Sequence, residues 1–175
     1  MAATAMGCAG GTSAAPEAAS VPPQATTWAE FGAAYCAAFD ALVTAVGNPD
    51  AGSDSDLTAS LKAAVEAHDA ATADRLAAEI TGHLERGRRA AWIARGWRSA
   101  GPAMAQLERV LIAFEAMVEA RRAAAAGASG APDPQAAFEQ AGGVTAWFAM
   151  LEAMRGLERP PGTTPTTCPT VPVSY

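Results

Sequence analysis

The chain has 175 residues, enough for one domain of ordinary size, and half of them are apolar, with alanine the commonest. Its net charge of −6 argues against general nucleic-acid binding, which requires a basic surface. No run of eighteen apolar residues occurs, so the sequence predicts no transmembrane helix.

Residues 1–26 contain little that could form a core. Glycine, proline, serine and alanine dominate this segment, and large apolar side chains are nearly absent. Such a composition does not bury enough apolar surface to offset the entropy of ordering the chain. We therefore expect a flexible tether ahead of the folded domain.

Cys8 lies in this segment, directly after Ala5-Met6-Gly7. The tetrapeptide resembles the lipobox of bacterial lipoproteins, a Leu-(Ala/Ser)-(Gly/Ala)-Cys pattern; Gly7 and Cys8 match it, and Ala5 stands where leucine is usual. The resemblance implies cleavage before Cys8, attachment of diacylglycerol and palmitate to that residue, and anchoring on a bacterial membrane. It also implies an apolar signal region encoded upstream of Met1. The alternative is that Cys8 is an incidental residue of a flexible leader.

The first predicted helix covers residues 27–46. Thr27 and Glu30 have the spacing of a capping box, in which each side chain accepts a backbone hydrogen bond from the other residue. Large apolar residues then recur at the spacing of one helical face: Phe31, Tyr35, Phe39, Leu42 and Val46. A Gly-Asn-Pro-Asp sequence at 47–50 ends the helix.

A second helical region begins near Asp54 or Ser55, and its apolar pattern continues to about Trp97. A single helix of that length would be unusual in a small domain. Polar side chains between residues 68 and 74 offer the backbone local alternatives to helical hydrogen bonds. We therefore expect a kink or short turn near residues 68–72, followed by a further helix from about 72 to 98.

Ser99-Ala100-Gly101-Pro102 stops this region and starts the next helix, which extends to about Ala126. A Gly/Ser/Pro-rich loop at 127–133 follows. Asp133 is placed to cap the last helical region, which ends before Pro160. The large apolar residues of that last region are Phe138, Val144, Phe148 and Leu151.

The predicted fold class is all-α. Gly142-Gly143 interrupts the last helical region, which is therefore either one helix or two pieces. No segment shows the alternating pattern of a strand, and short connections favour antiparallel neighbours. We expect an antiparallel bundle of four to five helices over residues 27–159, preceded by the tether and followed by a tail at 160–175.

The tail is rich in proline and threonine and would be disordered if it were free. Cys168 nevertheless lies within it, and Cys36 lies inside the first predicted helix. A disulfide between them would hold the tail against that helix, and the chain-entropy model values so long a loop at about 4–5 kcal/mol. A lipidated Cys8 could not compete for either partner. The alternative is two independent thiols, with Cys36 a small buried apolar group.

A basic and aromatic cluster lies between residues 86 and 98 of this acidic chain. Its members are Arg86, Arg88, Arg89, Trp92, Arg95, Trp97 and Arg98. On a tethered protein such a cluster would contact anionic lipid head groups or another anionic ligand. The alternative is an ordinary solvated helix face, with Glu85 paired to Arg89 and the tryptophans in the core.

The two histidines, His68 and His83, are weak candidates for a metal site. Glu79 lies one helical turn before His83, but the Glu-x-x-His spacing of di-iron bundles is one residue shorter. Zinc requires three or four convergent protein ligands, and methionines at helical spacing are usually core residues rather than haem ligands. We therefore expect no metal and no cofactor.

The sequence contains no nucleophile elbow, zinc-protease motif, phosphate-binding loop or dinucleotide fingerprint. Cys36, within an apolar helix, is expected to be unreactive. We therefore interpret the chain as a non-catalytic protein of the cell envelope, lipid-anchored or secreted. Its expected partners are the membrane and an envelope protein or small ligand, and not nucleic acid. Two alternatives stay open: an extracytoplasmic metal or haem binder that uses His68 or His83, and a cytosolic helical bundle.

Overall fold

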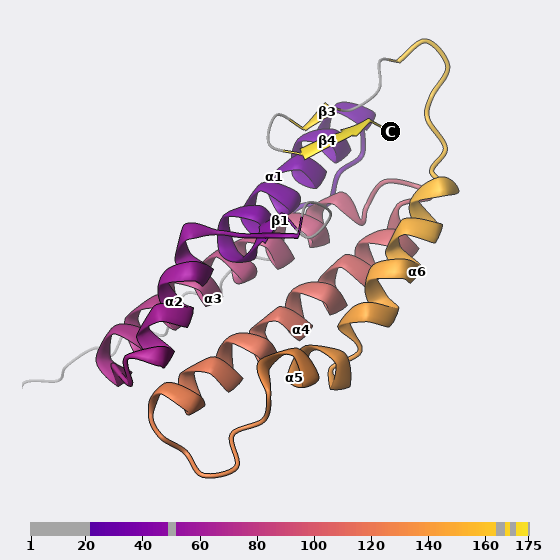
Figure 1. Ribbon diagram of the computed structural model, residues 1–175. Helices are drawn as coiled ribbons and strands as arrows, with labels where there is room; N and C mark the ends of the chain where they lie inside the picture. The colour runs from indigo at the N-terminus through magenta and orange to yellow at the C-terminus, as the bar shows by residue number, and fades with distance from the viewer. Residues whose placement is uncertain (1–21, 49–51, 164–166, 169–170, 175) are drawn as a thin grey trace, which may run out of the picture.

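A computed structural model describes residues 22–48, 52–163, 167–168 and 171–174 (Figure 1). The helices in these ranges are α1 (Trp28–Val46), α2 (Asp56–Glu66), α3 (Ala70–Ala94), α4 (Gly101–Ala125), α5 (Pro134–Gln140) and α6 (Gly143–Arg155). Two short antiparallel hairpins join β1 (Gly47–Asn48) to β2 (Ser53–Asp54) and β3 (Thr167–Cys168) to β4 (Val171–Ser174). The chain is mostly helical, which confirms the predicted all-α class. The hairpins were not predicted, because strands this short leave no alternating pattern.

The predicted helix starts are confirmed by their capping hydrogen bonds. The Thr27 hydroxyl accepts from the Glu30 backbone N–H at 3.2 Å, and the Glu30 carboxylate accepts from the Thr26 and Thr27 N–H groups at 2.8 and 3.1 Å. These bonds lower the pKa of Glu30, because they favour its ionised form. Asp133 caps α5 in the same way, accepting from the Ala136 N–H at 2.9 Å.

The expected break in the second helical region is present. α2 ends at Glu66, His68 adopts a left-handed backbone with φ of 52°, and Asp69 caps α3 by accepting from the Thr72 N–H at 3.0 Å. α3 therefore begins two residues earlier than expected, and it ends at Ala94 rather than near residue 98. Gly142, with φ of 80°, separates α5 from α6 and resolves the last region into two helices.

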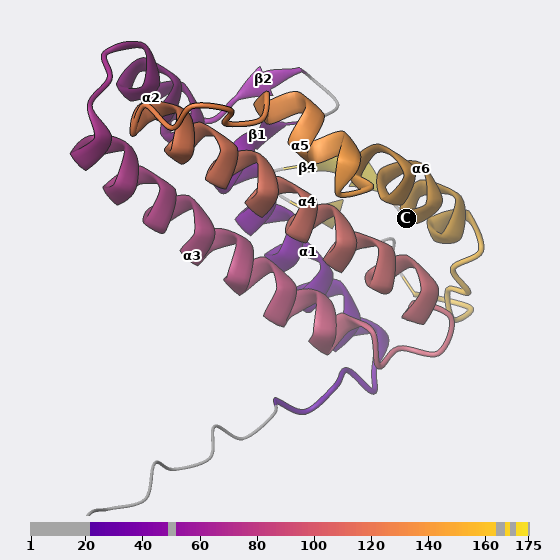
Figure 2. The ribbon, with the colours of Figure 1, turned by 90° about the horizontal axis from the view of Figure 1, so that it is seen from below.

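The long helices pack in series, α1 against α3, α3 against α4, and α4 against α6 (Figures 1 and 2). The predicted face of α1 is buried in full. Close approach depends on Gly87, where an added Cβ would lie 3.3 Å from the Leu111 methyl groups of α4 and 3.4 Å from the Ala38 carbonyl of α1. Small residues thus let three helices meet at short distance.

The buried face of α6 differs from the expected one. Ala146, Met150 and Met154 are buried, whereas Val144 and Phe148 are 40% and 65% exposed. Both sets have helical spacing, so periodicity alone could not choose between them. Val144 and Phe148 are therefore turned away from the core, whereas Trp147 and Leu151 pack against it and the two methionines lie inside it.

Both ends of the described chain are fastened to the helical core. A disulfide joins Cys36 to Cys168, with the Cα atoms 5.1 Å apart, which confirms the predicted pairing. It holds the β3–β4 hairpin against α1 (Figure 1). Before α1, Ala25 is buried and its N–H donates to the Ile93 carbonyl at 2.8 Å. The contacts of the core therefore begin ahead of Thr27.

α1 is apolar enough and long enough to cross a membrane, with a mean hydropathy of 1.3. Half of its most apolar window is buried inside the protein. The helix packs on α3 along one side and carries the disulfide to the tail hairpin on another part of its surface. Its apolar character is therefore accounted for by its place in the core.

Candidate functional site

The predicted arginine and tryptophan cluster lies on the C-terminal half of α3 and the turn after it. Trp97 is 7% exposed and meets Trp28 edge to face, with ring centroids 5.8 Å apart. Trp92 is half-buried. The guanidinium groups of Arg95 and Arg98 lie 5.9 and 5.6 Å from the Trp92 and Trp97 rings. The two tryptophans are therefore mainly packed inside the protein and form little of an exposed patch.

Two arginines of this cluster join α3 to α4. Arg88 forms an ion pair with Glu115 at 3.3 Å, and Arg95 forms one with Glu108 at 3.9 Å. Burial raises the pKa of both glutamates, and the neighbouring guanidinium groups oppose that shift. Within this cluster, the exposed arginines that form no ion pair with a described residue are Arg86, Arg89 and Arg98. The alternative pairing of Glu85 with Arg89 does not form.

The structure does not bring the histidines together. His68 is exposed in the turn before α3, whereas His83 lies on α3 about 20 Å further along the axis. Glu79 pairs with Arg75 at 3.7 Å. Burial, and then the charge of Arg86, lower the pKa of His83. Among the described residues, no group of three or more His, Cys, Asp or Glu side chains could hold a metal ion.

Cys8 and the rest of the lipobox-like segment lie outside the described residues, so lipid attachment stays a prediction. Cys36 and Cys168 are joined, which leaves neither as a free thiol. Cys168 is 5% exposed in the tail hairpin, so its sulfur is also shielded from solvent.

An apolar pocket that the sequence analysis did not predict opens between α4, α5 and α6. Its volume is about 300 Å³. Its apolar lining consists of Phe114, Met117, Phe138, Val144, Trp147 and Phe148. Trp147 forms the wall towards α1, with its ring 6.5 Å from that of Phe39. The pocket therefore lies among α4, α5 and α6, and Trp147 separates it from the aromatic residues of α1.

The shape of this pocket follows from the tight junction between α5 and α6. An added Cβ on Gly143 would lie 2.4 Å from the Phe138 ring, so only glycine permits the crossing. Phe138 is thereby placed against Phe114 of α4, with ring centroids 4.6 Å apart. α5 has only seven residues and α4 has 25, so α5 covers only part of α4. The α4 residues that line the pocket are Phe114 and Met117.

A second cavity of about 250 Å³ continues the apolar pocket along α4. The two cavities share Phe114, Met117 and Gln135, and the second ends at Arg121 and Lys62. Phe114, Met117 and Arg121 have the spacing i, i+3 and i+7, which places them on one face of α4. We call this continuous surface, from Phe148 through Met117 to Arg121, the α4 groove.

Arg121 is the unusual polar group of the α4 groove. Burial lowers the pKa of its guanidinium and the charge of Asp54 opposes that shift, yet arginine keeps its proton in proteins. Its buried Nη1 atom has no hydrogen-bond partner, and Arg121 forms no ion pair within the described ranges. A half-buried cation without a partner is costly, which makes Arg121 a candidate for contact with an anionic ligand.

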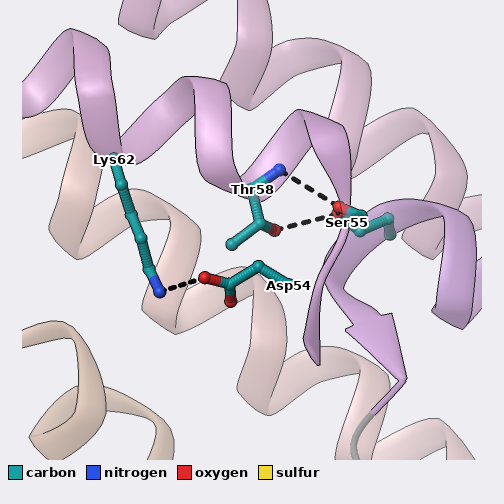
Figure 3. A network of polar contacts seen from close by, with 5 residues as sticks. Asp54, Ser55, Thr58 and Lys62 are labelled. Carbon is teal, nitrogen blue, oxygen red and sulfur yellow. Dashed lines mark hydrogen bonds and ion pairs between the residues drawn. The ribbon is translucent and has the colours of Figure 1, made fainter. Parts of the chain in front are cut away.

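Asp54 is the acid whose charge acts on Arg121, and its carboxylate already has another partner. Asp54 forms an ion pair with Lys62 (Figure 3). Beside it, the Ser55 and Thr58 hydroxyls both donate to the Ala45 carbonyl, at 2.9 and 3.1 Å, and hold the start of α2 against the end of α1. This network fixes the rim of the cavity that Asp54 and Arg121 both line, and it pairs Asp54 with Lys62 rather than with Arg121.

No protein-family model matches this chain, and no curated protein or solved structure is significantly similar to it. The functional interpretation therefore depends on the residues and their geometry. The sequence did carry one signal for the α4 groove: Arg121 interrupts the apolar spacing begun by Phe114 and Met117.

Proposed function

We propose that this chain is a non-catalytic binding protein of the bacterial cell envelope, attached to the membrane through a lipidated Cys8 or else secreted. In this proposal, an antiparallel helical bundle over residues 27–159 presents a binding surface to a small ligand or an envelope protein. Residues 8–24 act as the tether between the membrane and the bundle, whose core contacts begin at Ala25. Nucleic acid is not a partner.

The Cys36–Cys168 disulfide is the observation that carries this proposal. It links residues 132 positions apart and encloses most of the folded chain. Disulfides of this kind form and persist outside the cytoplasm and are rare in reducing compartments. The bond also uses two of the three cysteines, which leaves Cys8 as the one cysteine for a lipid. The cytosolic alternative is correspondingly disfavoured.

A binding role is favoured over catalysis by the chemistry of the described surface. The buried glutamates are held in ion pairs with arginines, and the two histidines are far apart. The α4 groove, by contrast, is a mostly apolar concavity with a few polar groups at one end, the usual composition of a ligand site. No observation favours the metal or haem alternative.

The test is to express the full native locus in its own host, separate membrane and soluble fractions, and measure the intact mass and free thiols of the purified chain. We expect a membrane-bound protein that begins at Cys8, carries a diacylglycerol-type mass increase and has no free thiol. A Cys8→Ser variant should leave the membrane fraction and keep its disulfide. An unmodified chain with three free thiols in the soluble fraction would overturn the proposal.

A further inference from the structure

We propose that the α4 groove binds one free fatty acid, with the alkyl chain in the apolar pocket and the carboxylate at Arg121. This inference deepens the proposed function, because it rests on that function for its biological role and names the class of small ligand. The site itself is defined by the groove and can be tested separately.

The apolar end of the groove calls for an apolar occupant. Phe148 and Val144 are 65% and 40% exposed at its mouth, beside the half-buried ring of Trp147. Exposed apolar side chains at the mouth of an apolar cavity are typical of a site for an apolar ligand. A volume of about 300 Å³ corresponds to roughly ten water molecules at about 30 Å³ each. That space suits a single alkyl chain and not the two chains of a phospholipid.

The polar end of the groove calls for an anion. The cation of Arg121 has a buried nitrogen without a partner, and a carboxylate would supply a partner in the two-pronged geometry that guanidinium groups prefer. Among the described residues, the acids that line the cavities at Arg121 are Asp54, Glu66 and Asp133. Asp54 is paired with Lys62 and Asp133 accepts the capping hydrogen bond from Ala136, while Glu66 is exposed at the far rim.

The spacing along α4 joins the two ends into one site. Phe114 and Arg121 lie seven residues apart on the same face, which separates them by about 10 Å along the helix axis. Met117 lies between them and lines both cavities, so an extended chain can pass from one to the other over an adaptable side chain. A small anion would fill only the Arg121 end and a hydrocarbon only the other.

The test uses calorimetric titration of the 175-residue chain with its disulfide formed, with laurate below its micelle concentration as the probe. Dodecanol provides the same chain without charge, and butyrate provides the charge without the chain. We expect one laurate to bind per chain and butyrate to show no saturable binding. Arg121→Met should weaken laurate binding by about tenfold or more, because a hydrogen-bonded charge contact is lost, and leave dodecanol binding unchanged.

Matched variants separate this effect from general disturbance of the protein. Arg122→Met removes the neighbouring arginine, which is exposed and pairs with Asp74, and should leave laurate binding intact. Phe148→Ser should weaken both laurate and dodecanol, whereas Ile112→Ser, at an exposed position that does not line the groove, should weaken neither. Laurate brominated at its terminal carbon should quench tryptophan fluorescence, and Trp147→Phe should remove most of that quenching.

Three results would overturn the inference: no saturable laurate binding, equal effects of Arg121→Met and Arg122→Met, or association with anionic phospholipid vesicles but not with free laurate. Lipidation of Cys8 is read independently, by mass. Absence of laurate binding to a chain lipidated at Cys8 would therefore reject the groove and leave the envelope assignment standing. Laurate binding by a chain with three free thiols would support the groove and reject the envelope assignment.

Discussion

The two sides of the helical core use their aromatic side chains in opposite ways. On the α1–α3 side, Phe31, Tyr35 and Phe39 are buried in a ladder with ring centroids 5.7 and 4.7 Å apart. On the α5–α6 side, no residue of α5 is buried, and Phe148 is 65% exposed. One side is closed by its own chain, and the other leaves apolar side chains exposed.

Helix length, rather than composition, produces this difference. α3 has 25 residues and accompanies α1 along its whole course, whereas α5 has seven residues and extends about 10 Å. The glycine pair at 142–143 ends α5 early and turns the chain into α6. The same kind of aromatic residue is therefore structural where a long partner helix is present and available for binding where it is not.

The largest expected contrast comes from the same truncation on each side. Phe31→Ala should lower the free energy of unfolding by about 3–5 kcal/mol, since it removes a fully buried ring and leaves a cavity. Phe148→Ala should lower it by less than about 0.5 kcal/mol, because most of that ring is already in water. Urea unfolding of both variants with the disulfide intact measures the contrast. Similar losses would show that the α4 groove is part of the core.

Loss of the disulfide should have the next largest effect on the free energy of unfolding. The disulfide adds a covalent link on the α1–α3 side, which is already well packed. In a Cys8→Ser background, Cys168→Ser should lower the free energy of unfolding by about 2–5 kcal/mol under oxidising conditions. Thermal unfolding with and without reductant is the measurement. Once both proteins are reduced, the variant and its parent should unfold at the same temperature; a difference there would mean that Cys168 stabilises by packing instead.

A smaller effect is expected where the two sides meet, at the β1–β2 hairpin. Gly47 has φ of 100°, and an added Cβ would lie 1.9 Å from the Ser53 carbonyl oxygen. Gly47→Ala should therefore cost about 2–3 kcal/mol through backbone strain and a shifted hairpin. Gly127 also has positive φ but has open space around it, so Gly127→Ala should cost about 1 kcal/mol or less. Equal costs would assign the effect to φ alone.

The helical architecture was predictable because its signals are local. The Thr27–Glu30 capping box, the turn near Asp69 and the Gly142 interruption each depend on side chains within a few residues of the backbone they satisfy. The Cys36–Cys168 pairing is a distant contact, but few cysteines were available to form it. Strands of two to four residues gave no periodic signal.

The α4 groove was not predictable, because it depends on which of two helical faces α6 turns inward. Phe148 has the largest side chain of the two alternative faces, and apolar size alone would bury it. Gly143 instead packs against the Phe138 ring, which fixes the rotation of α6 and turns Met150 into the core. Exposure of Arg86 and Arg89, and pairing of Arg88, likewise depend on where α4 lies beside α3.

A matched pair of arginines sharpens the comparison further. Arg88 is paired with Glu115 between α3 and α4, so Arg88→Met should cost about 1 kcal/mol by leaving a partly buried carboxylate without its partner. Arg121 has no such partner among the described residues, so Arg121→Met should leave the free energy of unfolding unchanged or raise it slightly. Urea unfolding without added fatty acid tests both. A clear loss of stability in Arg121→Met would make that arginine a structural residue.

The smallest expected effect is a pH dependence that arises inside the closed part of the core. Burial, and then the charges of Glu85 and Glu119, raise the pKa of Glu115, while Arg88 lowers it; the net result lies above the ordinary value of 4.5. The folded state therefore takes up this proton at a higher pH than the unfolded state does. By linkage, Glu115 makes the protein more stable as pH falls from neutrality towards 4.5.

Glu115→Gln cannot take up the proton and should gain less stability over that interval. Urea unfolding at several pH values gives the difference in unfolding free energy between the two proteins. That difference cancels contributions of opposite sign, such as that of His83, whose lowered pKa makes the protein less stable as pH decreases. Parallel pH profiles would mean that Glu115 is solvated as well in the folded protein as in the unfolded chain, and that the α3–α4 interface is less closed than its ion pairs indicate.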